Sequence, residues 1–278
     1  MDVCLRRAAS TARTRWRGKW ALVTGASAGI GRELARQLAA GGTNLVLTAR
    51  RGDRLAGLAR ELTAQHKIQA EAFPADLARP EAPAELFRFT QQKRLPIEVL
   101  VNNAGFGKYG EFFRADAQRL LEMVQVNVAA VVQLTHLFLS PMAERRSGYV
   151  LIVSSTAAFQ PVPYISTYAA TKGFELLFAE GLAEEMRAYG VRVCCLCPGS
   201  TESEFHQVAG QPPRTARRRE SAEKVARVGL EALAEGRPCV ISGRQNWVNV
   251  QAQRLVPRRL VTRVAARLFA PRAQEGRG

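Results

Sequence analysis

The fold is decided by the stretch KWALVTGASAGIG at residues 19–31. It begins as a short apolar strand, passes through a turn that contains Gly25, Gly29 and Gly31, and leads into residues with the apolar spacing of a helix. Glycines let a phosphate approach the backbone closely, and a helix N-terminus offers free N–H groups and a positive dipole. The stretch therefore predicts a site for the pyrophosphate of a dinucleotide.

The rest of the chain repeats this alternation of strand and helix. Short apolar runs typical of buried strands lie at residues 44–49, 68–73, 97–101, 149–154, 191–196 and 239–242, separated by segments with helical spacing. Such alternation predicts an α/β fold with a single parallel sheet covered by helices on both faces. The chain has 278 residues, 47% of them hydrophobic, which suits one large domain of this kind.

The residues after the second strand bear on the choice of cofactor. Arg50 and Arg51 follow this strand, and no carboxylate appears before Asp53. In dinucleotide folds an acidic residue at this position binds the ribose hydroxyls, whereas arginine accommodates a 2′-phosphate. With Ser27 as an added hydroxyl donor, the pattern favours NADP(H) over NAD(H), because guanidinium pairs well with phosphate. The alternative is that these are surface arginines at the start of a helix.

A candidate catalytic pair stands at Tyr168 and Lys172, in the stretch YAATK. Four residues are about one helical turn, so both side chains project from one face of the expected helix. A neighbouring ammonium favours the phenolate and lowers the pKa of a tyrosine toward the working range. Ser155 lies thirteen residues upstream, at the end of a strand, where a hydroxyl is able to hold a carbonyl. The alternative is a packed tyrosine beside a solvated lysine.

Two amide-bearing stretches complete the pattern. Small and amide residues, Asn102 to Gly105, follow the strand at residues 97–101 and suit close packing of a cofactor. Asn127 lies among valines in a long expected helix at about residues 115–139. Asparagine is costly to bury without partners, so it is either satisfied locally or functional.

In their order and spacing these motifs resemble those of the short-chain dehydrogenase/reductase family, over about residues 19–245. The motifs are TGASAGIG at residues 24–31, Asp76-Leu77, Asn102-Asn103-Ala104-Gly105, Asn127, Ser155, Tyr168 with Lys172, and Pro198-Gly199. The resemblance implies a Rossmann-type, doubly wound parallel sheet of about seven strands, in a homodimer or homotetramer. Within the family the chain looks most like a bacterial reductase branch, and its beginning resembles membrane-bound 3-ketoacyl-CoA and 17β-hydroxysteroid reductases.

The resemblance also implies roles for the matching residues. Tyr168 would protonate the carbonyl oxygen during reduction and act as the base in the reverse direction. Lys172 would hold the nicotinamide ribose and lower the pKa of Tyr168, Ser155 would orient the carbonyl, and Asn127 would anchor a water that relays protons to Lys172. The implied cofactor site consists of Gly25, Ser27, Gly29, Ile30, Gly31, Arg50, Asp76, Leu77, Asn103, Ala104, Gly105, Tyr168, Lys172, Pro198, Gly199, Thr201 and Ser203.

The net charge of +16 is concentrated at the two ends of the chain. Residues 1–20 hold six basic groups against one acid, and residues 254–278 hold seven arginines against one glutamate. We expect a basic, mobile arm at residues 1–18, with a mitochondrial transit peptide as the alternative, a catalytic domain at residues 19–245 and a basic amphipathic extension at residues 246–278. Such an extension docks on its own domain or a partner subunit, or lies on an anionic membrane.

Several functional classes lack support in the sequence. No zinc-finger spacing or basic helix with stacking aromatics is present, so nucleic acid is not an expected partner. Three of the five cysteines lie in one strand-like run, at Cys194, Cys195 and Cys197, which predicts buried thiols in a reducing compartment and no metal site. No apolar run long enough to span a bilayer and no secretory signal is expected. The expected location is therefore cytoplasmic, with peripheral membrane contact left open.

The predicted function is NADP(H)-dependent hydride transfer to or from a carbonyl or alcohol. Bulky apolar residues, Phe112 and Phe113 among them, cluster in the segments expected over the site, which favours a lipophilic ketone or aldehyde, such as a 3-oxoacyl or steroid-like compound. Two alternatives come from other classes: a catalytically silent NADP(H)-binding regulator and a membrane-surface scaffold acting through the basic ends. The intact set Ser155, Tyr168, Lys172 and Asn127 weighs against the regulator.

Overall fold

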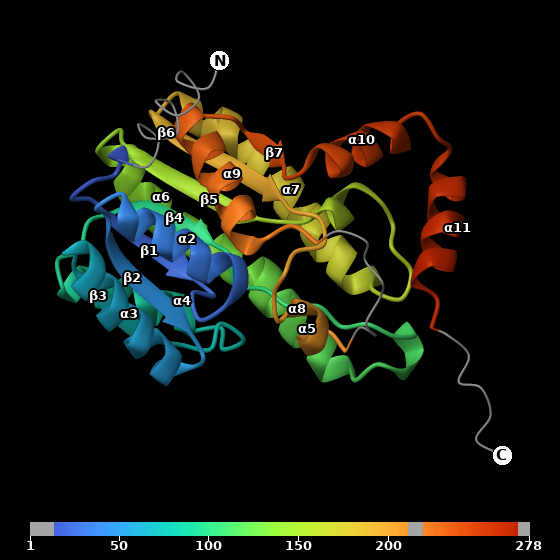
Figure 1. Ribbon diagram of the computed structural model, residues 1–278, viewed down its shortest axis with the longest axis horizontal. Coiled ribbons are helices and arrows are strands. Elements are labelled where there is room, and N and C mark those ends of the chain that lie inside the picture. Colours follow the sequence, from blue (N-terminus) through green and yellow to red (C-terminus); the bar gives the residue numbers. More distant parts are fainter. Residues whose placement is uncertain (1–13, 211–218, 272–278) are drawn as a thin grey trace.

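The computed structural model describes residues 14–210 and 219–271 and has at its centre a seven-stranded sheet, all parallel (Figure 1). The strand order is β3-β2-β1-β4-β5-β6-β7, as expected for a doubly wound Rossmann-type fold. The strands are β1 (Trp20–Thr24), β2 (Asn44–Ala49), β3 (Ala70–Pro74), β4 (Ile97–Asn102), β5 (Gly148–Val153), β6 (Val191–Cys197) and β7 (Cys239–Ile241). The predicted fold class is confirmed, and most strand boundaries lie within two residues of those expected.

Helices cover both faces of the sheet, and each face has its own apolar core. One core joins the sheet to α2 (Gly29–Ala40), α3 (Gly52–His66) and α9 (Ala222–Glu235). The other joins it to α4 (Ala82–Gln92), α6 (Ala130–Glu144) and α7 (Ser166–Arg187). Because both faces are covered, the central strands β1 and β4 are buried along their whole length, which explains their largely apolar sequences.

The strand order creates a crevice at one edge of the sheet. Strand β1 lies between β2 and β4, so the chain winds away from β1 in opposite directions on its two sides. In open parallel sheets, ligands bind outside the carboxyl ends of the strands at such a switch point. The glycine turn follows β1 and the Asn103–Gly105 segment follows β4, so both lie at this point.

The long helix after β4 is continuous from Ala117 to Glu144, but its turn at Gln125–Ala129 is a π-helix between α5 (Ala117–Val124) and α6. Among the described residues this helix alone is long and apolar enough to cross a bilayer, so the expectation of no such stretch was wrong. Half of its most apolar window is nevertheless buried inside the molecule, as in the core helix of a compact domain. Single π-turns in α-helices are frequent at functional sites.

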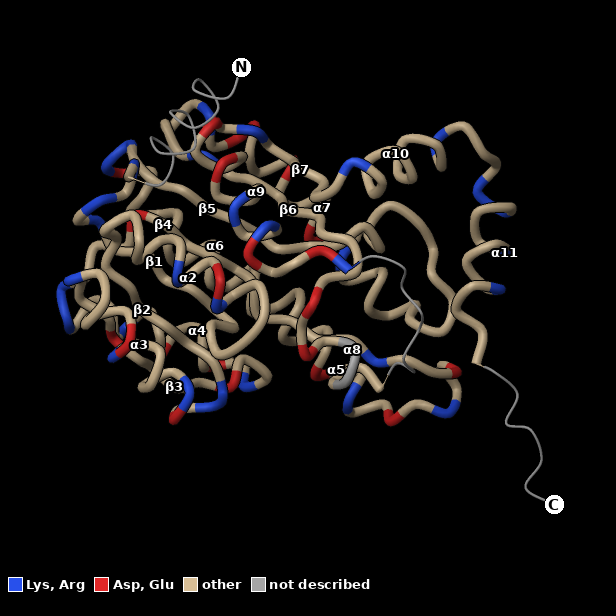
Figure 2. The backbone as a smooth tube through the Cα atoms, viewed as in Figure 1, with Lys and Arg blue, Asp and Glu red and all other residues tan. Residues whose placement is uncertain are grey.

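The two ends of the described chain differ in how they pack. Trp16 is 1% exposed and packs edge-on against Tyr149, with ring centroids 5.3 Å apart, so a mobile arm does not extend over residues 14–18. Residues 1–13 of that predicted arm lie outside the described part of the chain. At the other end, α10 (Arg244–Gln253) leads to α11 (Arg258–Phe269), which stands apart from the sheet and has basic residues along it (Figure 2).

The strand β6 buries three cysteines. Cys194, Cys195 and Cys197 are each 0% exposed and free of disulfides, which confirms the expectation of buried thiols. Burial raises the pKa of the Cys194 thiol to about 12, so this group stays protonated at neutral pH.

Candidate active site

A cavity of about 780 Å³ opens at the carboxyl edge of the sheet. Its lining includes residues that directly follow six of the strands, which is the arrangement that the switch point predicts. The cavity brings together all the residues proposed from the sequence except Gly31 and Asn127: Gly25, Ser27, Gly29, Ile30, Arg50, Asp76, Leu77, Asn103, Ala104, Gly105, Ser155, Tyr168, Lys172, Pro198, Gly199, Thr201 and Ser203.

The glycine turn is shaped for a close approach of a ligand. Gly25 and Gly29 have φ angles of +67° and +52°, which side-chain-bearing residues rarely adopt. The N-cap of α2, Ala28, provides no side-chain hydrogen bond, so no cap competes for the first N–H groups of the helix. Gly31 has a packing role, since a Cβ there would collide with the Gly25 carbonyl and the Asn103 amide. The turn thus fits an anionic group such as a pyrophosphate.

Asn103 supports the turn from behind. Its Nδ2 donates to the Thr24 carbonyl at 2.9 Å, and a Cβ on Gly25 would lie 2.7 Å from this nitrogen. The Thr24 hydroxyl in turn accepts from the backbone N–H groups of Asn103 and Ala104, both at 2.9 Å. These bonds join the ends of β1 and β4, so the Asn103 side chain fixes the shape of the glycine turn.

The other end of the cavity is basic. Arg50 is exposed and lines the cavity, and Arg51 beside it donates through Nη2 to the Ser27 hydroxyl at 3.0 Å. Arg51 and Arg54 also pair with the Glu204 carboxylate, at 2.7 and 2.8 Å. Hydrogen bonds from Arg54 and then Arg51 hold the pKa of Glu204 below its usual range. Arg51 and Glu204 were not among the proposed site residues, although Arg51 was visible beside Arg50.

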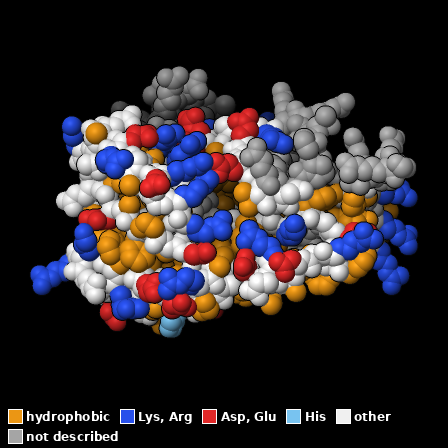
Figure 3. All heavy atoms as spheres, turned by 90° about the horizontal axis from the view of Figure 1, so that it is seen from below, with side chains coloured by type: hydrophobic (Ala, Val, Ile, Leu, Met, Phe, Trp, Pro, Cys, Tyr) orange, Lys and Arg blue, Asp and Glu red, His pale blue; other side chains and the backbone are white. Residues whose placement is uncertain are grey.

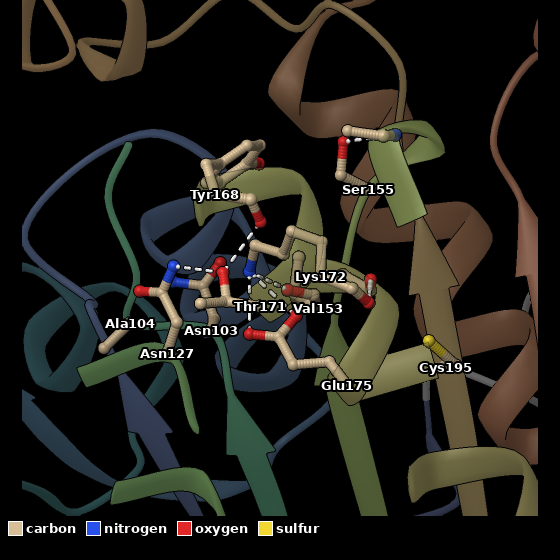
Figure 4. Close-up of polar contacts among 12 residues, drawn as sticks. Asn103, Ala104, Asn127, Val153, Ser155, Tyr168, Thr171, Lys172, Glu175 and Cys195 are labelled. Atoms are coloured by element: carbon tan, nitrogen blue, oxygen red, sulfur yellow. Dashed lines mark hydrogen bonds and ion pairs between the residues drawn. The ribbon is translucent and has the colours of Figure 1, made fainter. Parts of the chain in front are cut away.

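The candidate catalytic residues lie at the inner end of the cavity, where α7 begins. Tyr168 is 8% exposed and Lys172 is 4% exposed, and the Lys172 Nζ lies 5.7 Å from the centroid of the Tyr168 ring. The Lys172 ammonium donates to the Val153 carbonyl at 2.9 Å and to both Glu175 carboxylate oxygens at 2.9 and 2.8 Å (Figure 4). The surrounding fold therefore excludes the alternative of a solvated lysine.

The pKa of Tyr168 departs from the expected direction. Burial raises it, and this effect exceeds the lowering by the Lys172 charge and by a hydrogen bond with Ser155. The expectation that Lys172 lowers the pKa of Tyr168 is correct for that single interaction but wrong for the net shift. The reason is the burial of the phenol, which outweighs the Lys172 charge, and the Glu175 charge adds a smaller effect in the same direction as burial.

Asn127 lies behind the cavity wall in the π-turn. Its Oδ1 accepts from the Phe106 N–H at 3.2 Å, and its Nδ2 donates to the Phe106 carbonyl and to the Thr171 hydroxyl, both at 3.0 Å. Of the two alternatives open for Asn127, local satisfaction by hydrogen bonds is therefore correct. Its role in holding a water stays a prediction.

The side of the cavity next to Tyr168 is mostly apolar. The Phe205 ring lies 5.0 Å from the Tyr168 ring, between centroids, and further apolar lining comes from Phe106, Val126, Val162, Ile165, Val208 and Phe269. Phe112 and Phe113, expected over the site, are instead 69% and 77% exposed and do not line it. Arg119 contributes a charge to this side, with its guanidinium 3.9 Å from the Phe106 ring centroid and an ion pair to Glu122.

Comparison with known proteins agrees with this geometry. A family model described as short chain dehydrogenase matches residues 19–213, which is more than half of the chain. The chain belongs to the short-chain dehydrogenase family. The chain spans about half the length of two of the curated relatives that it matches.

Three relatives illustrate the range of the family around this chain. A very-long-chain 3-oxoacyl-CoA reductase of Anas platyrhynchos is 31% identical over 237 residues, covering 83% of this chain and 75% of that protein. Hydroxysteroid dehydrogenase-like protein 1 of Gallus gallus is 32% identical over 183 residues, so the chain matches 65% of its own length and only 55% of that relative. A short-chain dehydrogenase from Sphingobium yanoikuyae in complex with NADPH superposes with a TM-score of 0.78 at 26% identity, covering 94% and 99% of the two chains.

Glu175 is the site residue that sequence reasoning missed most clearly in this short-chain dehydrogenase. It lies three residues after Lys172 on the buried face of α7, is 1% exposed, and neutralises the lysine. The sequence does contain a signal for this residue, since Glu175 stands between Phe174 and Leu176 in an apolar helical segment. A carboxylate buried in such a segment needs a partner, which indicates a pairing with a nearby cation.

Proposed function

We propose that this short-chain dehydrogenase catalyses NADP(H)-dependent hydride transfer, which reduces a lipophilic ketone or aldehyde or oxidises the corresponding alcohol. The observation that carries the proposal is one cavity with a glycine turn and two arginines at one end and Ser155, Tyr168 and Lys172 at the other. Each part has a distinct task in such a reaction, and the apolar wall lies on the side of the tyrosine.

The residues of the adenosine end fit a phosphorylated dinucleotide. Gly25, Gly29 and the N-terminus of α2 are suited to the pyrophosphate, and Ser27 with Arg50 and Arg51 to the 2′-phosphate of NADP(H). When bound, the cofactor supplies or accepts the hydride. The NADPH in the complex of the Sphingobium yanoikuyae relative supports the choice of the phosphorylated form.

The catalytic end moves the proton that accompanies the hydride. Ser155 donates a hydrogen bond that orients the carbonyl oxygen, and Tyr168 delivers its phenolic proton to that oxygen during reduction. In the oxidation direction the Tyr168 phenolate takes the proton of the alcohol. The Lys172 ammonium stabilises the phenolate and holds the nicotinamide ribose, while the buried wall around Tyr168 excludes water.

The apolar wall supports a lipophilic substrate. Phe106, Phe205 and Phe269 line the cavity near Tyr168 and bury ketone substituents without cost in polar desolvation. The names of two relatives, a very-long-chain 3-oxoacyl-CoA reductase and a hydroxysteroid dehydrogenase-like protein, point to the same chemical class.

Turnover of a substrate panel tests the proposal. Purified protein is assayed with NADPH and with NADH against aromatic, steroidal and 3-oxoacyl carbonyls. We expect turnover with NADPH that falls by roughly 10²- to 10⁴-fold in Tyr168→Phe, and unchanged turnover in Tyr189→Phe, an exposed tyrosine just beyond α7. Nucleotide binding without turnover on any compound would favour a silent regulator, and turnover that survives in Tyr168→Phe would contradict the assigned role.

We also infer a homo-oligomer. Leu121, Val124 and Val132 on the α5–α6 helix and Phe174 and Leu177 on α7 are apolar and exposed, on helices that pack against each other. A second copy of the chain is suited to cover this apolar face. Light scattering after gel filtration should give a dimer or tetramer for the wild type and a smaller species for Leu177→Arg; a monomeric wild type would contradict this inference.

Peripheral membrane contact is a second candidate, favoured by one specific observation. On α11, Leu260, Val264 and Leu268 form an exposed apolar stripe, and Arg259, Arg263 and Arg267 form an exposed stripe beside it. Figure 3 shows basic side chains gathered at the end of the molecule where α11 lies. This arrangement suits the surface of an anionic bilayer.

Vesicle flotation tests the membrane proposal with the full chain. We expect the wild type to float with vesicles of phosphatidylserine and phosphatidylcholine, and the triple variant Arg259→Gln, Arg263→Gln, Arg267→Gln to remain in solution. Equal flotation of both proteins would show that these arginines do not carry the binding, and no flotation of the wild type would remove the membrane from the account.

A further inference from the structure

The catalytic lysine has no free hydrogen in this structure. The Lys172 ammonium carries three N–H groups, and the structure gives it three acceptors: the Val153 carbonyl and the two carboxylate oxygens of Glu175. The side chains of the two residues are 5% and 2% exposed. If the nicotinamide ribose is to accept a hydrogen bond from Lys172, one of these three acceptors must give up its bond.

The surroundings leave Glu175 dependent on Lys172. From its own helix it faces Lys172 and, farther off, Tyr168. On β6, Cys195 acts on Lys172 and Cys197 acts on Tyr168. Hydrogen bonds with Cys197 and Cys239 and burial raise the pKa of Cys195, whereas the pKa of Cys197 is lowered by Cys195 but raised on balance by Cys239 and burial, so both thiols are neutral. From the end of β5 the Ser154 hydroxyl, which donates to the Lys172 carbonyl at 2.8 Å, lowers the pKa of Glu175 and bears no charge.

The neutral neighbours do not replace the lysine. Asn127 in the π-turn bears no charge, and its amide is fully used by Phe106 and Thr171. Among the described residues that the structure places against Glu175, Lys172 is thus the one cation. Loss of that partner would leave a buried, uncompensated carboxylate.

The pair responds to pH in the neutral range. Burial raises the pKa of Glu175 to about 7, against the lowering effect of Lys172. Below that pH the carboxyl is protonated, accepts more weakly from Lys172 and leaves the positive charge free to act elsewhere. Above it the carboxylate neutralises Lys172 and holds its hydrogen atoms.

From this geometry we propose that Glu175 is a positioning residue that competes with the nicotinamide ribose for Lys172 and sets how much of the lysine charge acts on Tyr168. The proposal rests on the proposed function, since it needs Lys172 to hold that ribose. The proposal has two testable consequences. The affinity for the cofactor should weaken as Glu175 ionises. The Tyr168 phenolate should form at a higher pH than it would beside a lysine without a paired carboxylate.

The test compares Glu175→Gln with Glu184→Gln. Glutamine keeps the shape of glutamate without its charge, and Glu184 is a matched control, since it forms an i,i+3 ion pair with Arg187 at 2.8 Å on the same helix but is 73% exposed. NADPH dissociation constants are measured by fluorescence titration at several pH values. The 2′-phosphate of NADPH titrates in all proteins alike, so the difference between variants isolates Glu175.

We expect the wild-type dissociation constant to rise, relative to Glu175→Gln, by about fivefold or more between about pH 6 and about pH 8.5. Glu184→Gln should follow the wild type. In alcohol oxidation, the rise of kcat/KM with pH should have its midpoint at lower pH in Glu175→Gln, because the carboxylate no longer raises the pKa of Tyr168. Glu175→Asp, which keeps the charge, should restore the wild-type direction of both dependences.

Each outcome bears on a distinct claim. Parallel pH dependences in the wild type and Glu175→Gln would overturn the inference and leave the proposed function intact. If Glu175→Gln does not fold, Glu175→Met, an uncharged side chain of similar length, replaces it, and a pH dependence parallel to that of the wild type in this variant overturns the inference. Wild-type protein that binds no NADPH at any pH would overturn the proposed function, and this inference with it.

Discussion

Helix α7 carries two ion pairs of the same design in opposite environments. Lys172 with Glu175 and Arg187 with Glu184 each join residues three apart, and each has a closest N–O distance of 2.8 Å. The side chains of the first pair are 5% and 2% exposed, and those of the second are 78% and 73% exposed. The spacing along a helix determines which side chains form an ion pair, whereas burial determines how strongly that pair affects the charge, stability and reactivity of the residues around it.

The contrast explains why we assign a part in the proposed reaction to the buried pair and not to the exposed pair. Water surrounds the side chains of Arg187 and Glu184 and screens the attraction between their charges. In the interior, burial and neighbouring charges shift the pKa values of the pair. Burial raises the pKa of Glu175 to about 7, and the Glu175 charge raises the pKa of Lys172 against the lowering effect of burial. Perturbed groups of this kind cluster at functional sites.

The largest expected effect comes from breaking the buried pair completely. Glu175→Ala removes the carboxylate and leaves the Lys172 ammonium buried without its partner. We expect a loss of about 3–5 kcal/mol in the free energy of unfolding, measured by urea denaturation. A loss below about 1 kcal/mol would mean that water reaches Lys172 and that the pair is buried only in appearance.

A second prediction concerns the pH dependence of stability. The pKa of Glu175 is about 7 in the folded chain, above its value of 4.5 when unfolded. The folded state therefore holds a proton that the unfolded state loses, so this contribution to stability is full below the unfolded pKa and disappears as the pH rises through about 7. Urea denaturation at about pH 5 and about pH 8 should show the wild type losing stability relative to Glu175→Gln; the opposite sign would contradict the raised pKa.

A third prediction disturbs the buried pair without touching its charges. A Cβ added at Gly105 would lie 3.4 Å from the Lys172 Nζ and 3.1 Å from the Asn127 Oδ1, so Gly105→Ala should displace the ammonium by a few tenths of an ångström. We expect kcat to fall by about tenfold, because small misplacements at a catalytic group are costly. Gly181→Ala on the exposed face of α7 meets no atom within 4 Å and serves as the control; equal effects in both variants would argue against a tight fit around Lys172.

A fourth prediction moves to the exposed end of the cavity. Arg51 is 42% exposed and shares Glu204 with Arg54, so its contribution is weakened by solvent and by that competition. Arg51→Ala should raise the dissociation constant of NADPH by about tenfold and leave that of NADH nearly unchanged. Arg54→Ala, which keeps the bond from Arg51 to Ser27, is the matched control. A similar loss for NADH and NADPH would mean that Arg51 does not recognise the 2′-phosphate.

The smallest effect should come from breaking the exposed pair. Glu184→Ala removes an ion pair that is well solvated on both sides, and we expect the free energy of unfolding to change by about 1 kcal/mol or less. Its pH and salt dependence should match those of the wild type. A change as large as that of Glu175→Ala would remove burial as the explanation for the difference between the two pairs.

The parts of the site that depend on local sequence were predictable. The glycine turn at residues 25–31 and the pair Tyr168 and Lys172 follow from spacing within one strand, turn or helix, and the structure brings them to one cavity edge. The parallel sheet followed from the same local patterns, because strands separated by helices must pair in parallel.

The parts that depend on distant contacts were not predictable. The pairing of Arg51 with Glu204 was not predicted, because the two residues lie about 150 positions apart along the chain. The predicted shift of the Tyr168 pKa had the wrong sign, because spacing shows that a lysine is near but not that distant segments bury the phenol deeply enough to outweigh the lysine charge. Trp16 was assigned to a mobile arm, because nothing near it in sequence indicates that Tyr149 covers it.

Transfer of an isotopic label tests the central claim most directly. NADPH that carries deuterium at the reactive position of its nicotinamide is incubated with the wild-type chain and the carbonyl panel, and the alcohols are analysed by mass spectrometry. We predict one deuterium in the alcohol of at least one lipophilic ketone or aldehyde, and none above background with Tyr168→Phe. Failure of the wild type to bind NADPH, or label transfer that persists in Tyr168→Phe, would contradict the account.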